Sequence, residues 1–523
     1  MSLVMRKIYI TLALLILGVA GMAYLYFSNL MKDSNNNDHA LYTVVNSAPV
    51  IFTFENDKGF YDILSKQEVT TELLGTEKSQ LLKTLKSAIV DNSGINNWIE
   101  GKKVILGFLP GQNNTVDFAI AVQLQNMDVN EASLKNLKAE IKKEGNYYEL
   151  KFGDTATCYL SLKNQAIFIS NSKQGITQIN AAKNTESDFA DYIKKNSRFA
   201  KNTLANIYVN YGQLPSLLKN ILNSTLTGEL SLFNKQNAYA ALSYNFGSDK
   251  LLLNGYTEVN SETNFFKLFA DQKEQKVSID QCFPEQTANY TLFTIEDYEK
   301  WSKALKNLQK ENKEEDKINK QHQEINEQYR IKIEQSFPVY FNKQLAVLQL
   351  KTGEKIGVVD IKNGDKLEQF LLDLSTEYAP EIRIFKEPHL LGNFFGEPFK
   401  KFERPFFTII DNHFVVANYA STLQVFLNSY RGNKLLVSTN DYTYFKDQIS
   451  SSATIAFYIN RDNSSDIFSK NLRAPYYKQY QSKNGVKDYN AFGYQLSADN
   501  GKFLSNVLLL KNQTTNTIDS LKY

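Results

Sequence analysis

Three short strings in this sequence carry residue types that could cleave an ester or amide. Penicillin-recognising serine enzymes use Ser-x-x-Lys, Ser-x-Asn and Lys-Thr-Gly, with the first serine as nucleophile and its lysine as proton acceptor. The strings begin here at Ser216, Ser243 and Lys351. They fall in different halves of an internal repeat, and Ser243 lies in an expected strand instead of a loop. We therefore predict no catalytic residue and a protein that is not an enzyme.

The sequence does not predict a phosphate-binding loop or a metal site. A P-loop needs four residues between its glycines and a Ser or Thr after its lysine. Gly94 and Gly101 have six residues between them, and Lys103 follows Lys102, so this segment is expected to be a turn. No histidine pairs with another His or Cys at metal-ligand spacing; the four are His39, His322, His389 and His413. We predict no metal and no cofactor.

Two acids occupy matched positions in the repeat. Glu55 and Glu296 each follow an apolar strand-like run and precede an amphipathic helical pattern. Carboxylates near a helix N-terminus stabilise its positive end and cap free N–H groups. We expect both residues to act structurally in this way.

The stretch 390–407 is aromatic and locally basic, and Pro398 and Pro405 interrupt it. Proline confines strands to sheet edges or loops. Three of its aromatic residues align with strand positions in the first repeat, which favours a place in the core. The alternative is an edge that contacts lipid or a partner, through the candidate residues Phe394, Phe395, Phe399, Phe402 and Phe406.

Length and composition favour several globular domains. The chain has 523 residues, too many for one core. It is 42% hydrophobic and 22% charged, so each domain can bury a core. The net charge is only +3 and no basic stripe is visible, so a nucleic-acid partner is not expected. Cys158 and Cys282 are expected to be separate buried thiols, with one disulfide as the alternative.

The N-terminus predicts a membrane anchor. Residues 8–27 carry no charge and follow Arg6 and Lys7. As a helix, this segment is long enough to span the hydrocarbon core of a bilayer. The basic pair then stays in the cytoplasm, which places the protein in the inner membrane with its bulk periplasmic or extracellular. A cleaved signal peptide ending at 21–23 is the alternative.

The sequence repeats itself. Residues 50–64 align with 291–305, including Phe52 with Phe293. Residues 145–148 and 167–176 align with 392–395 and 414–423 at an offset of 247, and residues 205–210 align with 455–460 at an offset of 250. Four matches in one order predict a duplication. The aligned blocks predict strands followed by helices that start near Ser172 and Tyr419.

The expected architecture is α+β: an N-terminal transmembrane helix, then two tandem copies of one mixed, mainly antiparallel sheet-plus-helices unit. A charged run within the second copy is expected to form a solvated helix or helical hairpin that projects from the domain, or a partner-binding coiled coil. The predicted segments are a cytoplasmic stub 1–7, anchor 8–27, tether 28–41, copy one 42–258, connector 259–285, copy two 286–511 with its charged insertion at about 306–334, and tail 512–523.

The matched blocks, the anchor and the opening Ser47-Ala-Pro-Val-Ile-Phe of copy one resemble envelope proteins of the Bacteroidota, the family filed as domain of unknown function 3352. The resemblance covers residues 42–511 and implies neither an activity nor functional residues. The anchor, the duplication and the missing chemistry together favour a non-enzymatic envelope scaffold with a protein partner. A lipid or unfolded-chain carrier that uses aromatic sheet faces is the second hypothesis. A hydrolase with an unrecognised site is the third.

Overall fold

The structure is a computed structural model that describes residues 38–57, 60–61, 76–124, 134–153, 156–182, 187–197, 203–223, 237–247, 250–482 and 488–511. The predicted anchor 8–27 lies outside these residues. Within them, no helix combines the length and apolar character that crossing a bilayer requires. The predicted tether is wrong at its end, because helix α2 (His39–Val45) begins there and buries Leu41.

Ten strands of the first half form one antiparallel series. Each strand pairs with its neighbours in the order β4-β5-β6-β7-β3-β2-β1-β8-β9-β10. The strands are β1 (Val50–Glu55), β2 (Lys103–Pro110), β3 (Val116–Gln123), β4 (Glu140–Glu144), β5 (Tyr147–Phe152), β6 (Ala156–Lys163), β7 (Ala166–Ser170), β8 (Ala205–Asn210), β9 (Ala238–Phe246) and β10 (Lys250–Val259).

The second half forms a series of the same kind. Its order is β15-β16-β17-β18-β14-β13-β12-β20-β21-β22, again antiparallel throughout. The strands are β12 (Thr287–Thr294), β13 (Phe341–Leu350), β14 (Lys355–Ile361), β15 (Ser375–Ala379), β16 (Ile382–Phe385), β17 (Phe406–Ile410), β18 (His413–Ala417), β20 (Ile455–Asn460), β21 (Tyr489–Asp499) and β22 (Lys502–Lys511).

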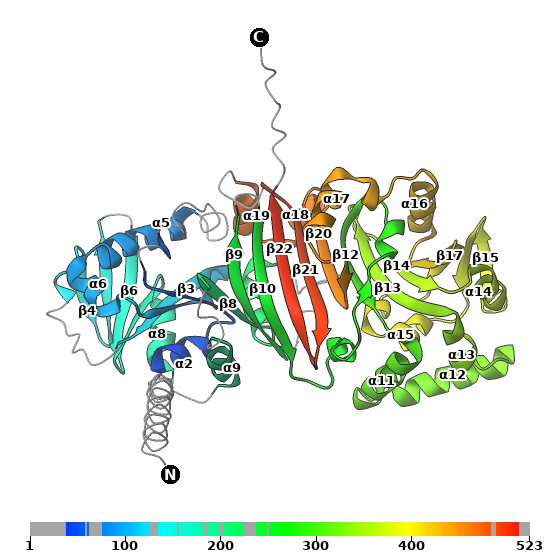
Figure 1. Cartoon of the computed structure of the whole chain (residues 1–523), viewed down its shortest axis with the longest axis horizontal. Helices are drawn as coiled ribbons and strands as arrows, with labels where there is room; N and C mark the ends of the chain where they lie inside the picture. The colour runs from blue at the N-terminus through cyan, green and yellow to red at the C-terminus, as the bar shows by residue number, and fades with distance from the viewer. Residues whose placement is uncertain are drawn as a thin grey trace, which may run out of the picture.

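The two series meet where β10 pairs with β22, which makes one sheet of 20 strands. This seam runs from the pair Lys250 and Leu510 to the pair Thr257 and Phe503 and lies at the centre of the molecule (Figure 1). A separate two-stranded sheet joins β11 (Gln275–Lys276) of the connector to β19 (Ser452–Ala453).

Helices cover both faces of the first half of the sheet. One face carries α2, α8 (Lys173–Ala181) and α9 (Asp188–Ser197), which share a core with inward-facing residues of β1, β2, β3 and β7. The other face carries α5 (Thr76–Leu85), the π-helical turn η1 (Lys86–Val90) and α6 (Ser93–Ile99). Figure 1 shows these two layers below and above the sheet.

Helices also cover both faces of the second half. Adjacent strand residues point to opposite cores, since side chains alternate along a strand: Val358 joins one and Val359 the other. The first face carries η5 (Ile279–Cys282), α16 (Ala420–Arg431), η8 (Leu436–Ser438) and α17 (Asn440–Asp447). The second carries η4 (Phe265–Phe269), α11 (Tyr298–Glu311), α12 (Glu315–Tyr329), α13 (Ile333–Ser336), α14 (Gly364–Leu371), α15 (Leu390–Phe395) and η7 (Glu397–Phe399).

Several predicted elements are confirmed. Strands β7 and β18 lie at the aligned positions, as do β8 and β20. Helices α8 and α16 follow N-caps at Ser172 and Tyr419, as expected. The mixed α+β class with a large antiparallel sheet is therefore observed.

The charged run does form helices, but they do not project. Ile325 of α12 is buried in the core, and His322 stacks on Phe394 with ring centroids 5.3 Å apart. The helices therefore lie over the apolar face of the sheet. The predicted cap of α11 is also wrong, because Asp297, and not Glu296, accepts the hydrogen bonds from the amides of Glu299 and Lys300.

Candidate functional site

The most distinctive concave feature is an apolar cavity in the first half. It has a volume of about 480 Å³, within the range of small-molecule sites. Alternate residues of β1, β2 and β3 form its floor, and residues of η1 and α6 form part of its wall. Strands of the second half also contribute. Its apolar lining includes Phe52, Phe54, Leu106, Ile120, Val122, Ile207, Leu253, Ile89, Trp98, Phe492, Val507 and Leu509.

The wall of the cavity is held by specific polar contacts. Asn56, at the end of β1, donates from Nδ2 to Asn96 Oδ1 and to the carbonyl of Ile99, both at 3.0 Å, which fixes α6. Lys78 of α5 donates to the carbonyl of Val116 on β3. Helix α5 then continues into the π-helical η1. Such turns are rare and often lie at functional sites.

The corresponding face of the second half is filled. Phe293 and Val359 are at most 2% exposed there, whereas Phe52 and Phe54 of the first half are only half-buried and face the cavity. The filling comes from a series of aromatic rings in tilted contact with one another. Phe341 lies 4.6 Å from Phe395 between ring centroids, and the chain of contacts continues through Phe399 and Phe402.

This filling contains most of the predicted contact residues. Phe394, Phe395, Phe399 and Phe402 are buried in the core, so they do not form an exposed lipid or partner edge. Their predicted strand is also wrong, because residues 390–399 form α15 and η7, inserted between β16 and β17. Phe406, at the start of β17, is half-buried beside Tyr378.

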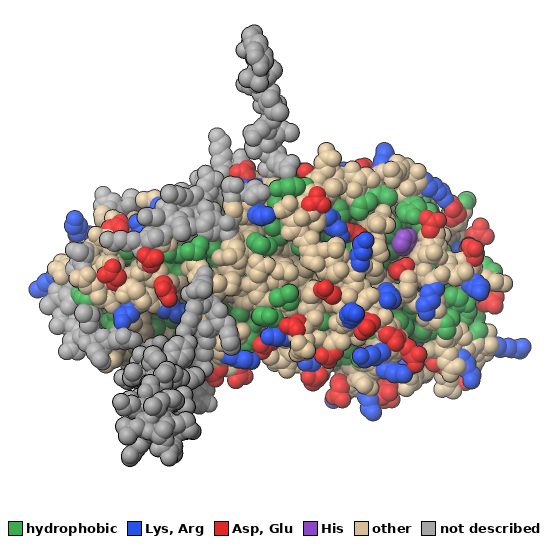
Figure 2. All heavy atoms as spheres, in the orientation of Figure 1, with side chains coloured by type: hydrophobic (Ala, Val, Ile, Leu, Met, Phe, Trp, Pro, Cys, Tyr) green, Lys and Arg blue, Asp and Glu red, His purple; other side chains and the backbone are tan. Residues whose placement is uncertain are grey.

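A second concavity, of about 1410 Å³, lies between α11, α12 and α13. Its lining is largely charged and amide side chains, and Figure 2 shows both charge signs interspersed over these helices at the lower edge of the second half. His322 lines it, and burial lowers the pKa of that imidazole. The hydroxyl of Ser302, also in the lining, donates to the Glu299 carbonyl. A lining of mixed charge is typical of an interaction surface.

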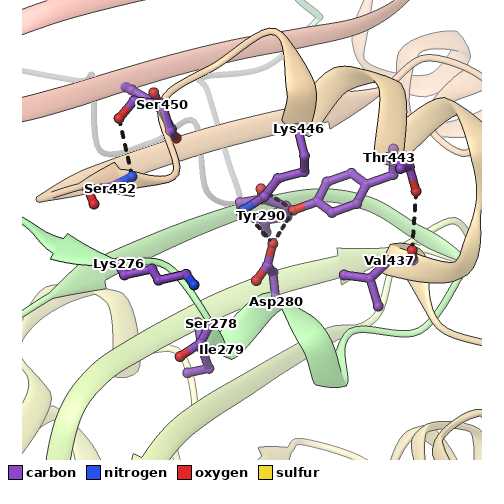
Figure 3. Close-up of polar contacts among 12 residues, drawn as sticks. Lys276, Ser278, Ile279, Asp280, Tyr290, Val437, Thr443, Lys446, Ser450 and Ser452 are labelled. Carbon is purple, nitrogen blue, oxygen red and sulfur yellow. Dashed lines mark hydrogen bonds and ion pairs between the residues drawn. The ribbon is translucent and has the colours of Figure 1, made fainter.

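The connector is fixed to the second half by a buried polar cluster. Asp280 is 2% exposed and accepts a hydrogen bond from Tyr442 Oη at 2.7 Å. It accepts a second one from Lys446 Nζ at 2.9 Å (Figure 3). The hydroxyls of Tyr442 and Tyr290 lie 2.7 Å apart. Burial raises the pKa of both phenols well above their usual value, so they stay protonated. A fully paired, enclosed cluster of this kind stabilises a fold.

The remaining sequence candidates do not converge. Ser216 lies on α10 (Leu214–Ile221) and donates to the Gln213 carbonyl, while Ser243 lies in β9 and donates to Asn206. The Lys351 string forms the turn after β13. Among the described residues, no three His, Cys, Asp or Glu side chains are grouped to hold a metal ion.

The two cysteines are separate, as predicted. Both are free and buried. Burial raises the pKa of the Cys158 thiol to about 12, and that of Cys282 is raised as well. Thiols that stay protonated are poor nucleophiles and poor metal ligands.

Comparison with protein-family models, with curated proteins and with solved structures gave no match for this chain. The resemblance to domain of unknown function 3352 therefore stays a prediction. The candidate site rests on geometry alone, and sequence reasoning missed it. The sequence signal was the alternation of Val50, Phe52 and Phe54 along β1, which gives that strand one apolar side facing the cavity.

Proposed function

We propose that this protein is a membrane-anchored, non-catalytic envelope protein that holds the alkyl chain of a lipid in the cavity of its first half. One observation carries the proposal: a cavity of about 480 Å³ with an almost wholly apolar lining, on a face that is solidly packed in the other half. Burying an alkyl chain there gains about 0.8 kcal/mol per methylene. An unfilled apolar cavity instead destabilises a fold.

We also propose that the two halves are tandem copies of one unit. Their strands pair in the same order, and equivalent residues meet across the centre. In the seam, Asn254 donates to Asn506 at 2.6 Å. Leu222, which follows α10, forms an isolated β-bridge with Leu472, which follows α18 (Ser465–Asn471). Contacts between matched residues are what a local two-fold axis produces.

The duplication makes the second half an internal control. The same sheet face is closed by α11, α15 and η7 in the second half and left hollow under α5 and η1 in the first. A difference confined to one copy favours a role for the hollow beyond folding. With the predicted anchor at 8–27 in the cytoplasmic membrane, the bilayer itself supplies the alkyl chain.

A protein partner is the second candidate function. The concave polar surface between α11, α12 and α13 favours it, since interaction surfaces combine polar rims with partly buried apolar groups. Chemical cross-linking of the full chain in its own membrane tests this proposal. A single cross-linked protein at constant stoichiometry supports it, and exclusively monomeric chain counts against it.

The two tryptophans provide a direct test of alkyl-chain binding. Trp98 lines the cavity, and Trp301 is fully buried in the second half. We would add a brominated alkyl carboxylate to the full chain in amphipol and record tryptophan fluorescence. Bromine quenches by contact, so we expect saturable quenching of Trp98.

The Trp98→Phe variant is the matched control, because it leaves Trp301 as the only tryptophan. We expect its fluorescence to stay unchanged at the same ligand concentrations. Equal quenching in the variant and the parent chain, or no saturable quenching in the parent chain, would refute alkyl-chain binding in the cavity.

A further inference from the structure

The polar side chains that line the cavity are cationic or neutral. They include Lys83, Lys86, Ser79 and Tyr61, and no carboxylate stands among the described lining residues. The chain as a whole has almost equal numbers of acids and bases, 56 and 59. The two charged side chains of the lining, Lys83 and Lys86, are both cationic.

The two lysines lie where the apolar lining gives way to solvent. Lys83 is in the last turn of α5 and is exposed, and Lys86 begins η1 three residues later and is half-buried. Residues three and four apart share a helix face. Leu82 and Ile89 on that face line the cavity, so the charged ends lie beside its apolar wall. Long lysine stems commonly follow apolar surface and place the ammonium group in water.

Lys86 already contacts a carboxylate. Its Nζ lies 3.4 Å from Asp91 Oδ1 and 5.8 Å from the centroid of the Tyr61 ring. The Asp91 side chain is 52% exposed, so it can turn away into solvent when another anion approaches. An anion that reaches Lys86 therefore has only this partly exposed ion pair to replace.

We propose that the cavity takes an anionic amphiphile, with its alkyl chain among the apolar side chains and its carboxylate or phosphate head on Lys83 and Lys86. This inference rests on the proposed function and adds the class of lipid. A lysine near an anionic head group contributes about 1 kcal/mol, which is about fivefold in affinity. An alcohol of the same length keeps the contribution of its buried alkyl chain and lacks the attraction between an anionic head and the two lysines.

The test compares brominated dodecanoate with brominated dodecanol by Trp98 quenching in the full chain. We expect the carboxylate to bind at least tenfold more tightly. The double variant Lys83→Glu/Lys86→Glu should remove that preference and leave the alcohol unchanged. The exposed Lys300→Glu on α11, away from the cavity, is the matched charge-reversal control and should change neither affinity.

A gain of affinity provides a second, independent readout. Asp91→Asn removes the internal competitor of Lys86, so we expect it to tighten carboxylate binding about threefold and to leave the alcohol unchanged. Brominated dodecyl methyl phosphate, a diester with one negative charge like dodecanoate, then distinguishes the sources: tighter binding than dodecanoate indicates a phospholipid head, and weaker binding indicates a free fatty acid.

The outcomes separate the two proposals. Equal affinity for acid and alcohol in the parent chain, or a preference that survives the double lysine variant, overturns the anionic head group and leaves alkyl binding intact. Failure of both ligands to quench Trp98 overturns the proposed function itself.

Discussion

The same substitution at two matched positions should have opposite effects. Val122 on β3 pairs with Ile167, and Val359 on β14 pairs with Phe414, the residue aligned with Ile167. Both valines are nearly buried, but Val122 lines the cavity and Val359 lies in the aromatic core. We predict that Val122→Phe is tolerated or stabilising, whereas Val359→Phe is destabilising.

The magnitudes follow from packing. Phenylalanine is larger than valine by about 50 Å³, and filling a void recovers about 24 cal/mol per Å³, so Val122→Phe gains up to about 1 kcal/mol. At Val359 the same ring must displace neighbouring side chains, and overpacking of that kind costs about 1–3 kcal/mol. The two variants should therefore differ by about 1–4 kcal/mol.

Thermal unfolding of the full chain in amphipol, followed by intrinsic fluorescence, shows which of the two variants is the more stable. The lipid assay adds a second readout, because a ring at Val122 removes room for about two methylenes. That loss is about 1.6 kcal/mol, or about fifteenfold in affinity for the brominated carboxylate. Equal destabilisation by the two variants, or unchanged ligand affinity in Val122→Phe, would refute the reasoning that only the first half is hollow.

Three further predictions concern the framework. Tyr442→Phe removes a hydrogen bond to buried Asp280 and should cost about 1–3 kcal/mol in chemical unfolding, whereas Tyr419→Phe, at an exposed position, should cost nothing measurable. Burial raises the pKa of Asp360 to about 6, so its contribution to stability is full below about pH 4 and is lost as pH rises through 6. The free energy of unfolding of Asp360→Asn, relative to that of the parent chain, should therefore be more favourable at pH 8 than at pH 4. A difference between the two chains that does not change with pH would contradict this. Asp297→Ala should destabilise α11 by about 1 kcal/mol, seen as faster amide exchange in its first turn.

Aligning the repeated blocks located strands and helix starts correctly wherever a block also had the hydrophobic pattern of a strand or a helix. Strands β7, β8, β18 and β20 lie at the aligned residues, because strongly apolar runs have one stable place in an antiparallel sheet. The alignment was less successful in register. Identity matched Phe52 with Phe293, but the pairings to β8 and β20 put Phe54 in the place of Phe293. A shift of two residues keeps every side chain on its face, so hydrophobic pattern alone cannot detect it.

The cavity and the aromatic filling could not be predicted, because both depend on which distant side chains reach one face of the sheet. Residues 145–148 resemble 392–395 in sequence, but the first segment is a turn and the start of β5, and the second lies in helix α15. An insertion between β16 and β17 carries those aromatic rings across the sheet, and sequence alignment treated it as the strand itself. In the first half, β5 ends at Phe152 and β6 begins at Ala156, so the connection between them is too short to carry such an insertion across the sheet.

The seam between β10 and β22 also bears on the history of the chain. In each half this strand is the last of its series, so a lone copy would end in an unpaired edge, and open edges attract further strands. Under the proposed duplication, a single-copy ancestor could cover that edge by self-association around a two-fold axis, with Asn254 opposite its own copy as it is now opposite Asn506. In such a homodimer every mutation occurs twice. On that proposal, fusion into one polypeptide would release the constraint and let one half become a solid support while the other kept an open interior.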